Sequence, residues 1–221
     1  MEVRTSQVTD IPAATEAREP APSAWLPRPA QWRVQATGVL AVAVSLAIGL
    51  ALVPPFAADL ARQGAVAAAD AAYLDDAEML LLRAIAWTPQ NAYLHQFLGE
   101  IYYRKALFRP QQQQTYLDAA LAAFERSARL NPQEAETYVL MGWVHLYRGD
   151  APAAEAAVMK AKVLDPNNPY VRYSLGTAYL WQKKLTQARA EMEFARRYFP
   201  NAGEIGIALQ EIDRLERGRS P

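Results

Sequence analysis

Two stretches of equal length, "LNPQEAETYVLMGWVHLY" (Leu130–Tyr147) and "LDPNNPYVRYSLGTAYLW" (Leu164–Trp181), decide the fold of this chain. In each, a proline at the third position is followed ten residues later by a glycine that stands after a large apolar residue. The interval from Pro132 to Pro166 therefore equals the interval from Gly142 to Gly176. Agreement of several positions at one fixed interval indicates an internal repeat.

Prolines at 89, 132, 166 and 200 extend this pattern; the last two intervals between them are equal, and the first is longer by nine positions. The glycine element recurs as "LGEIY" (98–102), "MGWVH" (141–145) and "LGTAY" (175–179). Before each proline come small residues five and twelve places back and a large apolar residue eight places back. In chain order these are Ala84, Ala77 and Leu81; Ser127, Ala120 and Phe124; Ala161, Ala154 and Val158; Ala195, Ala188 and Met192.

This set of positions resembles the tetratricopeptide repeat, a helix–turn–helix unit of about 34 residues that ends at a proline. The resemblance implies an all-α fold, an α-solenoid of about four repeats at 58–91, 92–134, 135–168 and 169–202. Small residues at Gly99, Gly142 and Gly176 would let the two helices of a repeat pack closely. The first repeat is degenerate, because Ala65 and Ala68 stand where glycine and tyrosine are expected.

Two segments depart from this repeat unit. The second repeat carries nine extra residues, which we place around 105–116, either as a longer helix plus a loop or as a protruding loop; its glutamines are interpreted as a polar spacer. After the last repeat, Ile205, Leu209 (or Ala208), Ile212 and Leu215 form a helical stripe. We expect a capping helix at 203–219, because a solenoid must cover its last apolar face.

The stretch 34–58 contains no charged residue, and its part 36–53 is strongly apolar. A bilayer core requires about 20 apolar residues of helix. We therefore predict one transmembrane helix at 34–57, ended by Pro54-Pro55, after a disordered, proline-rich tail at 1–33. A cleaved signal peptide and a buried soluble helix are the alternatives.

Basic residues near this segment predict its orientation. Arg18, Arg28 and Arg33 precede it, whereas only Arg62 follows it within similar reach. The N-terminus is expected in the cytoplasm of a bacterium, and the repeats are expected in the periplasm, anchored to the inner membrane by a single pass.

Small residues recur every fourth position of the predicted span, at Thr37, Ala41, Ser45 and Gly49. Such a row lets helices approach closely in lipid, so we predict a face that packs on another membrane helix. The alternative is a chance pattern in an alanine-rich span.

Composition excludes several classes of function. The chain has 23 basic and 23 acidic residues, which argues against a nucleic-acid partner. It has no cysteine, and its two histidines, His95 and His145, fall in different repeats, where we interpret them as packing residues. Asp75 and Asp76 are interpreted as favouring a helix N-terminus. With no metal-ligand spacing, phosphate loop or nucleophile motif, we expect no metal, no cofactor and no enzyme.

In the family, first-helix residues that do not pack line a concave face. In this chain most of these positions hold aromatic or apolar residues, which predicts a protein-binding groove. The remaining ones include Gln96, Glu100, Glu136 and Thr177. Its residues are Tyr93, Tyr103, Arg104, Val139, Trp143, Leu146, Tyr147, Tyr170, Tyr173, Leu180 and Trp181. The alternative is that these side chains pack against neighbouring helices. Some members grip a C-terminal carboxylate with Lys, Asn and Arg here, but this chain lacks those residues at the matching positions.

The leading hypothesis is a membrane-anchored adaptor that binds protein partners, as a subunit or assembly factor of a larger membrane complex. Besides these partners, it would contact lipid through its one helix. Two alternatives remain open: an accessory protein of polysaccharide synthesis or export, and a structural subunit of an energy-converting complex.

Overall fold

The computed structural model describes residues 29–218, and for residues 29–38, 48, 50–52 and 54 it describes the helical backbone only. The predicted tail falls largely on residues 1–28, which lie outside the description. The chain divides into two units at Gly49–Leu50, and each unit is considered by itself. Every regular element of the described residues is a helix, as expected for an all-α fold.

The first helix, α1, runs from Pro29 to Asp70. The expectation that Pro54-Pro55 end this helix is wrong, because α1 continues beyond them from Phe56 to Asp70. Each proline removes one N–H donor from the helix, and a helix tolerates that local loss when the residues on both sides favour helix. Among the residues with described side chains, no helix is both long and apolar enough to cross a bilayer.

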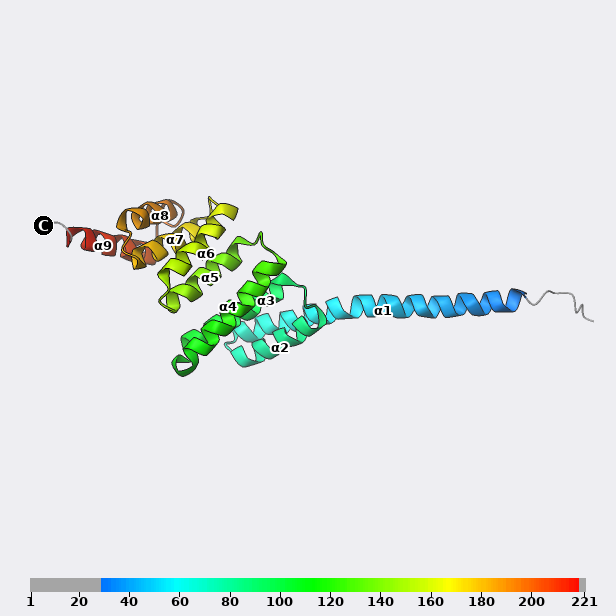
Figure 1. Cartoon of the computed structure of the whole chain (residues 1–221). Helices are drawn as coiled ribbons and strands as arrows, with labels where there is room; N and C mark the ends of the chain where they lie inside the picture. The colour runs from blue at the N-terminus through cyan, green and yellow to red at the C-terminus, as the bar shows by residue number, and fades with distance from the viewer. Residues whose placement is uncertain (1–28, 219–221) are drawn as a thin grey trace, which may run out of the picture. The chain divides into compact units, whose positions relative to one another are not determined.

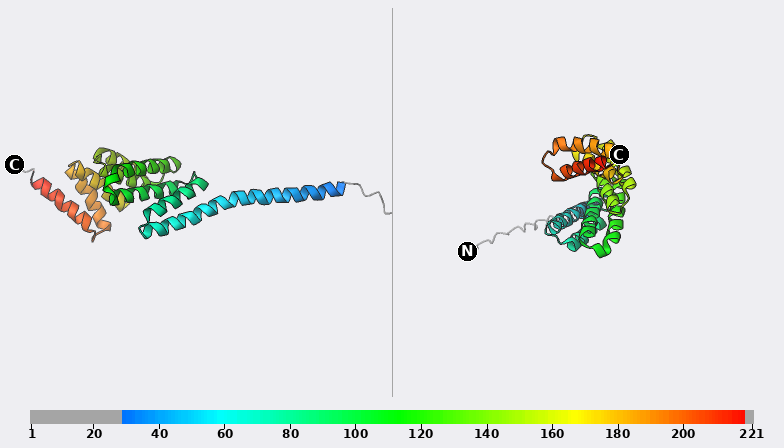
Figure 2. Two further views of the ribbon diagram at one scale, coloured as in Figure 1. Left: turned by 90° about the horizontal axis from the view of Figure 1, so that it is seen from below. Right: turned by 90° about the vertical axis from the view of Figure 1, so that its left-hand side faces the viewer.

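From the end of α1 onward the helices form successive antiparallel hairpins (Figure 1). In the end-on view of Figure 2, the hairpins from α3 to α9 follow one another in an arc. The bounds are α2 Leu74–Trp87, α3 Ala92–Phe108, the 3-10 turn η1 Pro110–Gln112, α4 Gln113–Leu130, α5 Ala135–Tyr147, α6 Ala151–Leu164, α7 Pro169–Trp181, α8 Leu185–Tyr198 and α9 Gly203–Arg217.

The repeat glycines lie where the two helices of a hairpin approach most closely. A Cβ atom added at Gly99 would come within 2.6 Å of the Phe124 ring, and one added at Gly142 within 2.4 Å of Val158. At Gly176 the nearest atom belongs to Met192, at 3.0 Å. All three partners are fully buried. The predicted role of these glycines in close packing is therefore confirmed.

The turn inside a hairpin depends on one residue in the left-handed region. This residue is Ala72 (φ 63°) between α1 and α2, Gly149 (φ 79°) between α5 and α6, and Lys183 (φ 58°) between α7 and α8. The equivalent position in the second repeat, Ala106, is helical and buried instead. Because Ala106 does not adopt the left-handed conformation that begins the turn in the other hairpins, α3 continues to Phe108.

The nine extra residues of the second repeat therefore lengthen its helices. α3 has 17 residues where α5 has 13, and α4 has 18 where α6 has 14. The connection at 109–112 is also one residue longer than the one at 148–150. Of the two alternatives for this insertion, the longer helix is correct. Its glutamines lie in η1 and the first turn of α4.

The last helix covers the end of the stack. Ile205, Leu209 and Ile212 of α9 are buried in one cluster with Leu175 of α7 and Met192 of α8. This packing is what the helical stripe predicted for a capping helix.

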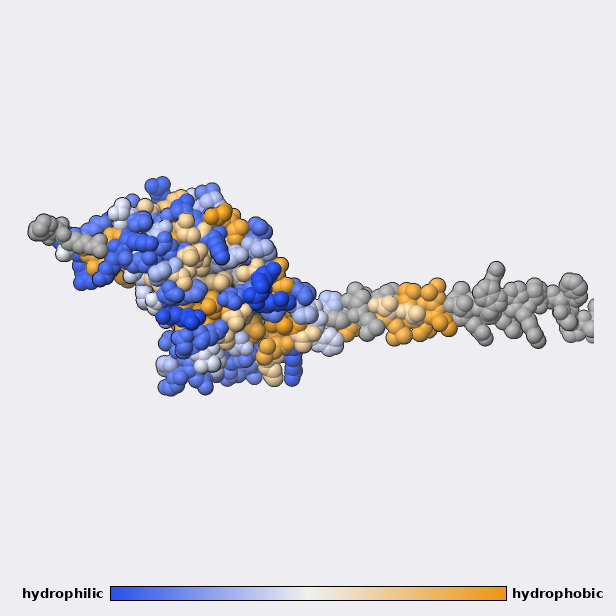
Figure 3. All heavy atoms as spheres, viewed as in Figure 1, coloured by the Kyte–Doolittle hydropathy of each residue, from blue (hydrophilic) through white to orange (hydrophobic). Residues whose placement is uncertain are grey.

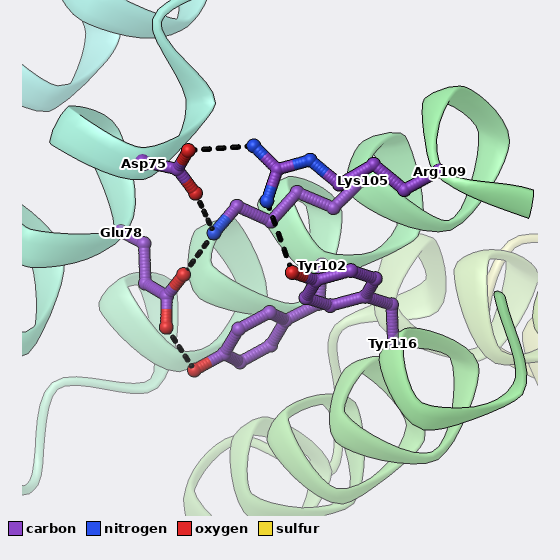
Figure 4. Close-up of polar contacts among 6 residues, drawn as sticks. All are labelled: Asp75, Glu78, Tyr102, Lys105, Arg109 and Tyr116. Carbon is purple, nitrogen blue, oxygen red and sulfur yellow. Dashed lines mark hydrogen bonds and ion pairs between the residues drawn. The ribbon is translucent and has the colours of Figure 1, made fainter. Parts of the chain in front are cut away.

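The added turn of α3 is fastened to α2 by ion pairs (Figure 4). Lys105 is only 2% exposed, and its Nζ atom lies 2.6 Å from Asp75 Oδ1 and also contacts Glu78 Oε2. Arg109 Nη2 donates to Asp75 Oδ2 at 2.6 Å. Asp75 therefore has a tertiary role beyond the helix-terminal one assigned to it from the sequence.

Tyrosines complete this polar cluster (Figure 4). Tyr102 Oη donates to Glu78 Oε1 at 3.0 Å, and Arg109 Nη1 donates to Tyr116 Oη at 3.0 Å. Hydrogen bonds from Arg109 and then Lys105 lower the pKa of Asp75 to about 2. Burial lowers the pKa of Lys105, but its bonds to Asp75 and Glu78 outweigh that effect and the pKa is raised. Both sides of the cluster are therefore charged at neutral pH.

Candidate functional site

The first helices of successive hairpins lie against one another, α3 against α5, α5 against α7 and α7 against α9. When hairpins stack along a curve, either their first helices or their second helices lie closer together from one hairpin to the next. The set that lies closer together is on the inner side of the curve. We use the term inner face for the solvent-accessible side of α3, α5 and α7. It is the surface that carries most of the predicted groove residues.

Five predicted groove residues are exposed there. The aromatic ones among them are between 43 and 59% exposed, which is high for such large apolar side chains. The five are Tyr93 and Arg104 on α3, Tyr147 on α5, and Tyr170 and Trp181 on α7.

Four others are half-buried, and the aromatic ones among them pack in pairs: Tyr103, Trp143, Tyr173 and Leu180. The rings of Tyr103 and Tyr147 meet edge to face with centroids 5.4 Å apart, and those of Trp143 and Tyr173 are tilted at 5.8 Å. These contacts join α3 to α5 and α5 to α7. The aromatic stripe is thus partly exposed to solvent and partly packed between hairpins, and the packing alternative applies to Tyr103, Trp143 and Tyr173.

Val139 and Leu146 differ from the other predicted groove residues, because the structure places them in the core. Val139 is 1% exposed and packs in the cluster around Leu175. Leu146 is 3% exposed and packs against Ala154 and Ala178. Their positions on α5 face the next hairpin, so neither side chain offers surface to a partner.

A pair of carboxylates lies among the aromatic residues of the inner face. Gln96, itself 4% exposed, donates from Nε2 to Glu100 Oε1 at 3.3 Å and to Glu136 Oε2 at 3.2 Å. Its Oε1 atom accepts from the buried Thr137 hydroxyl at 2.9 Å. Because this bond fixes the amide orientation, the Gln96 NH₂ group points at both carboxylates.

No ion pair neutralises these two carboxylates in the part of the chain that the structure describes. Within the described residues, neither Glu100 nor Glu136 takes part in an ion pair. Burial raises the pKa of Glu100, Glu136 raises it further, and Gln96 and Arg104 act in the opposite direction. Burial, with a contribution from Glu136, also raises the pKa of Tyr170. The sequence placed both glutamates on this face, but an interpretation based on aromatic residues missed their pairing.

A small apolar pocket lies at the C-terminal end of the inner face. It is lined by Tyr170 and Tyr173 of α7, Phe199 and Ala202 of the loop between α8 and α9, and Glu204 and Ile205 of α9. Glu204 also contributes to the raised pKa of Tyr173, after burial. The pocket thus combines aromatic walls with a carboxylate.

The predicted membrane-packing row lies on the N-terminal unit. Ala41 and Ser45 are exposed and Gly49 is half-exposed, whereas the side chain of Thr37 lies outside the description. The apolar neighbours of this row are exposed as well, with Val39 at 71% and Leu46 at 62%. Figure 3 shows this described part of α1 as a strongly apolar stretch.

The two histidines have local contacts. A ring nitrogen of His95 lies 3.0 Å from the carbonyl oxygen of Pro89, and burial lowers the pKa of the half-buried His145. Among the described residues, no group of three or more His, Asp or Glu side chains is arranged to hold a metal ion.

No protein-family model matches this chain. No curated protein matches it either. Solved structures do match. A thermophilic TPR protein of Thermus thermophilus, TTC0263, is 23% identical with a TM-score of 0.59, over 67% of this chain and 77% of that one.

Two further matching structures are described as peptide-binding proteins. YrrB, described as a TPR protein with an unusual peptide-binding site, is 15% identical with a TM-score of 0.56, over 71% of this chain and 76% of that one. The first TPR of Spaghetti (RPAP3), bound to the HSP90 peptide SRMEEVD, is 18% identical with a TM-score of 0.52, over 58% and 94%. At these identities the likeness concerns the fold, which is of the tetratricopeptide-repeat type.

Proposed function

We propose that this chain is a non-enzymatic adaptor, anchored in a membrane by one helix, that holds protein partners on its inner face. The observation that carries the proposal is the row of exposed Tyr and Trp side chains on α3, α5 and α7. Aromatic residues of this kind dominate the binding energy of protein interfaces. Solved proteins of the same fold bind peptides, YrrB and the first TPR of Spaghetti among them.

The apolar character of the N-terminal unit supports the anchor. The stretch 34–58 carries no charge along its whole length. As helix it is about 37 Å long at about 1.5 Å per residue, against about 30 Å for a bilayer core. Exposed Val and Leu side chains on this helix are costly in water and favourable in lipid.

The distribution of arginines gives the proposed topology, with the N-terminus in the cytoplasm and the repeats in the periplasm of a bacterium. In isolated membranes, the full chain is expected to resist extraction by high salt and by alkaline carbonate. Added protease should degrade the repeats in spheroplasts without lysis. Release by carbonate would contradict the anchor, and protection of the repeats in intact spheroplasts would contradict the topology.

The inner face is tested by pull-down from native membranes with the anchor intact. Tyr147 and Trp181 are the best residues to change, because about half of each side chain is exposed, although the Tyr147 ring also meets that of Tyr103, as the ring of the control residue Tyr198 meets that of Phe194. Trp143 is less suitable, since it packs against Tyr173 and against core residues. Tyr147→Ala/Trp181→Ala is expected to weaken capture of partners at unchanged helicity.

The matched control is Trp87→Ala/Tyr198→Ala, which removes equally exposed aromatic side chains from second helices, α2 and α8. Equal capture by both double variants and the wild type would contradict the proposal. The captured proteins also distinguish the alternatives. A glycosyl polymerase or ligase would favour the polysaccharide role, and stoichiometric co-purification with an energy-converting assembly would favour the structural one.

A further inference from the structure

The inner face combines exposed aromatic residues with carboxylates that form no ion pair within the described residues, although the exposed Arg104 lies near Glu100. Glu100 and Glu136 come from neighbouring helices, and among the described residues the neutral amide of Gln96 bridges them. Glu204 adds a third carboxylate at the pocket next to Tyr173. Arg104, the one predicted groove residue with a positive charge, is exposed and forms no ion pair within the described residues.

This arrangement is unfavourable for the free protein. Glu100 is half-buried, and two like charges that share a site repel each other in surroundings less polar than water. The Gln96 NH₂ group has only two hydrogens, and the carboxylates use both, so each keeps unused acceptor positions. A bound cation would relieve the repulsion and fill these positions.

The surrounding aromatic residues favour one kind of cation. Tyr170 of α7 is near both carboxylates, because, in addition to burial, Glu136 and Glu100 each help to raise its pKa, and Tyr103 of α3 is near Tyr170 and Tyr147, which, in addition to burial, help to raise its own pKa. Tyr103 and Tyr147 are in edge-to-face contact, and Tyr147 and Tyr170 are both more than 40% exposed. A guanidinium group stacks on such rings and donates to two carboxylates through its planar fork, whereas an ammonium group offers a point charge only.

We propose that the inner face binds an arginine-bearing segment of its partner protein, with the guanidinium group held between Glu100 and Glu136 and the flanking residues placed along the exposed tyrosines and Trp181. The inference rests on the proposed adaptor function and names the chemistry of the partner. Such a segment has the opposite charge to the acidic SRMEEVD peptide that the first TPR of Spaghetti binds.

The first experiment identifies the segment. A photo-crosslinking amino acid is placed at Tyr147, and in a second variant at Trp181, in the full chain in native membranes. Crosslinked peptides are then sequenced by mass spectrometry. The captured segment is expected to contain arginine and to carry a net positive charge.

The second experiment measures the role of the carboxylates. The captured segment is synthesised as a labelled peptide, and its Kd is determined for the detergent-purified full chain. Glu100→Gln/Glu136→Gln is expected to raise the Kd by about tenfold or more, because two charge-assisted hydrogen bonds lose their charge. Replacing the arginine of the peptide by lysine is expected to raise it several-fold. The control is Glu125→Gln/Glu193→Gln on α4 and α8, with an unchanged Kd.

The outcomes separate the two proposals. An acidic or neutral captured segment, or a Kd that Glu100→Gln/Glu136→Gln leaves unchanged, overturns the assignment of an arginine segment and leaves the adaptor standing. Absence of crosslinks at both positions, together with unchanged capture by Tyr147→Ala/Trp181→Ala, overturns the adaptor and this inference with it. Thermal unfolding of each variant shows that the fold is retained.

Discussion

The α3–α4 and α5–α6 hairpins are built alike over the residues they share and differ where one of them is longer. In both, a glycine of the first helix faces a buried apolar side chain of the second, Gly99 against Phe124 and Gly142 against Val158. At the C-terminal end of α5, Arg148 forms one ion pair with Asp118 of α4 at 3.3 Å. The longer hairpin forms more at the matching place, because both Lys105 and Arg109 pair with Asp75 of α2. The repeat glycines and their partners thus hold each hairpin together, and the extra residues add to the contact of the longer hairpin with α2.

The largest expected effect tests the shared part of the two hairpins. Gly99→Ala would place a Cβ atom within 3 Å of three carbon atoms of the Phe124 ring, which has no exposed side to move toward. We expect a loss of about 2–3 kcal/mol, and about 1–2 kcal/mol for Gly142→Ala, where one methyl group of Val158 must shift. Thermal unfolding of the detergent-purified full chain measures both.

Gly206→Ala in α9 is the control for this comparison. Nothing lies within 4 Å of the added methyl group, so only helix propensity changes, and we expect a gain of about 0.5–1 kcal/mol. If all three alanine variants changed stability by the same amount and sign, close packing at the repeat glycines would not be the cause.

The next effect concerns the longer hairpin alone. Lys105→Met removes the buried ammonium group and leaves Glu78 and Asp75 without it. Because these carboxylates are 25% and 65% exposed, water offsets part of the loss, and we expect about 1–2 kcal/mol. Hydrogen exchange should increase in α2 rather than throughout the stack.

Lys184→Met is the matched control, since the Lys184 side chain is 39% exposed against 3% for Lys105, and its pair with Glu155 should contribute less than about 1 kcal/mol. Equal losses for the two lysine variants, or unchanged exchange in α2, would show that the α2–α3 contact does not depend on the ion pairs.

The sequence predicts the contacts made by residues of the repeat pattern better than those made by the extra residues. The glycine and its apolar partner could be matched across repeats because each position has one steric requirement, met by Gly142 and Val158 as by Gly176 and Met192. The full cluster around Lys105 could not, because Arg109 and Tyr116 belong to the extra residues, which have no counterpart in the other repeats. Only its core has an equivalent, since Asp75 and Lys105 correspond to Asp118 and Arg148, which also form an ion pair.

The inner face could be predicted from the sequence only in part. The repeat pattern placed its residues on the first helices, but it could not tell which side chains point to solvent. Val139 and Leu146 occupy concave positions of the pattern and are buried, because α7 packs over that side of α5. The bond from Gln96 to Glu136, which brings the two carboxylates together, joins two repeats, and a pattern confined to one repeat carries no information about it.

A smaller effect tests the turn that the longer hairpin lacks. Gly149 has φ 79° with nothing near its Cα, so Gly149→Ala should cost about 1 kcal/mol through backbone strain alone. Ala72 adopts the same conformation with a Cβ atom, so Ala72→Gly should gain about 0.5–1 kcal/mol. Thermal unfolding compares the pair, and changes of the same sign would contradict the shared turn geometry.

The smallest expected effect is the pH dependence of stability, which should differ between Asp75 in the α2–α3 contact and Glu100 on the inner face. The pKa of Asp75 is lowered in the folded protein to about 2, so its contribution to stability is present above pH 3.8 and is lost as the pH falls toward 2. The contribution of Glu100 to stability depends on pH in the opposite direction. Burial and Glu136 raise its pKa, so its contribution is complete below pH 4.5 and is lost as the pH rises through the raised value.

Glu100→Gln is neutral at every pH, and it is therefore expected to unfold at a higher temperature than the wild type at pH 7 and at nearly the same temperature at pH 4. Glu125→Gln, at an exposed position of α4, is the control for the removal of one surface carboxylate. A bound arginine peptide should reverse the order at pH 7, because the charge that destabilises the free inner face then stabilises the complex. If the difference in unfolding temperature between Glu100→Gln and the wild type stayed constant from pH 4 to 8, the charge of Glu100 would not oppose folding.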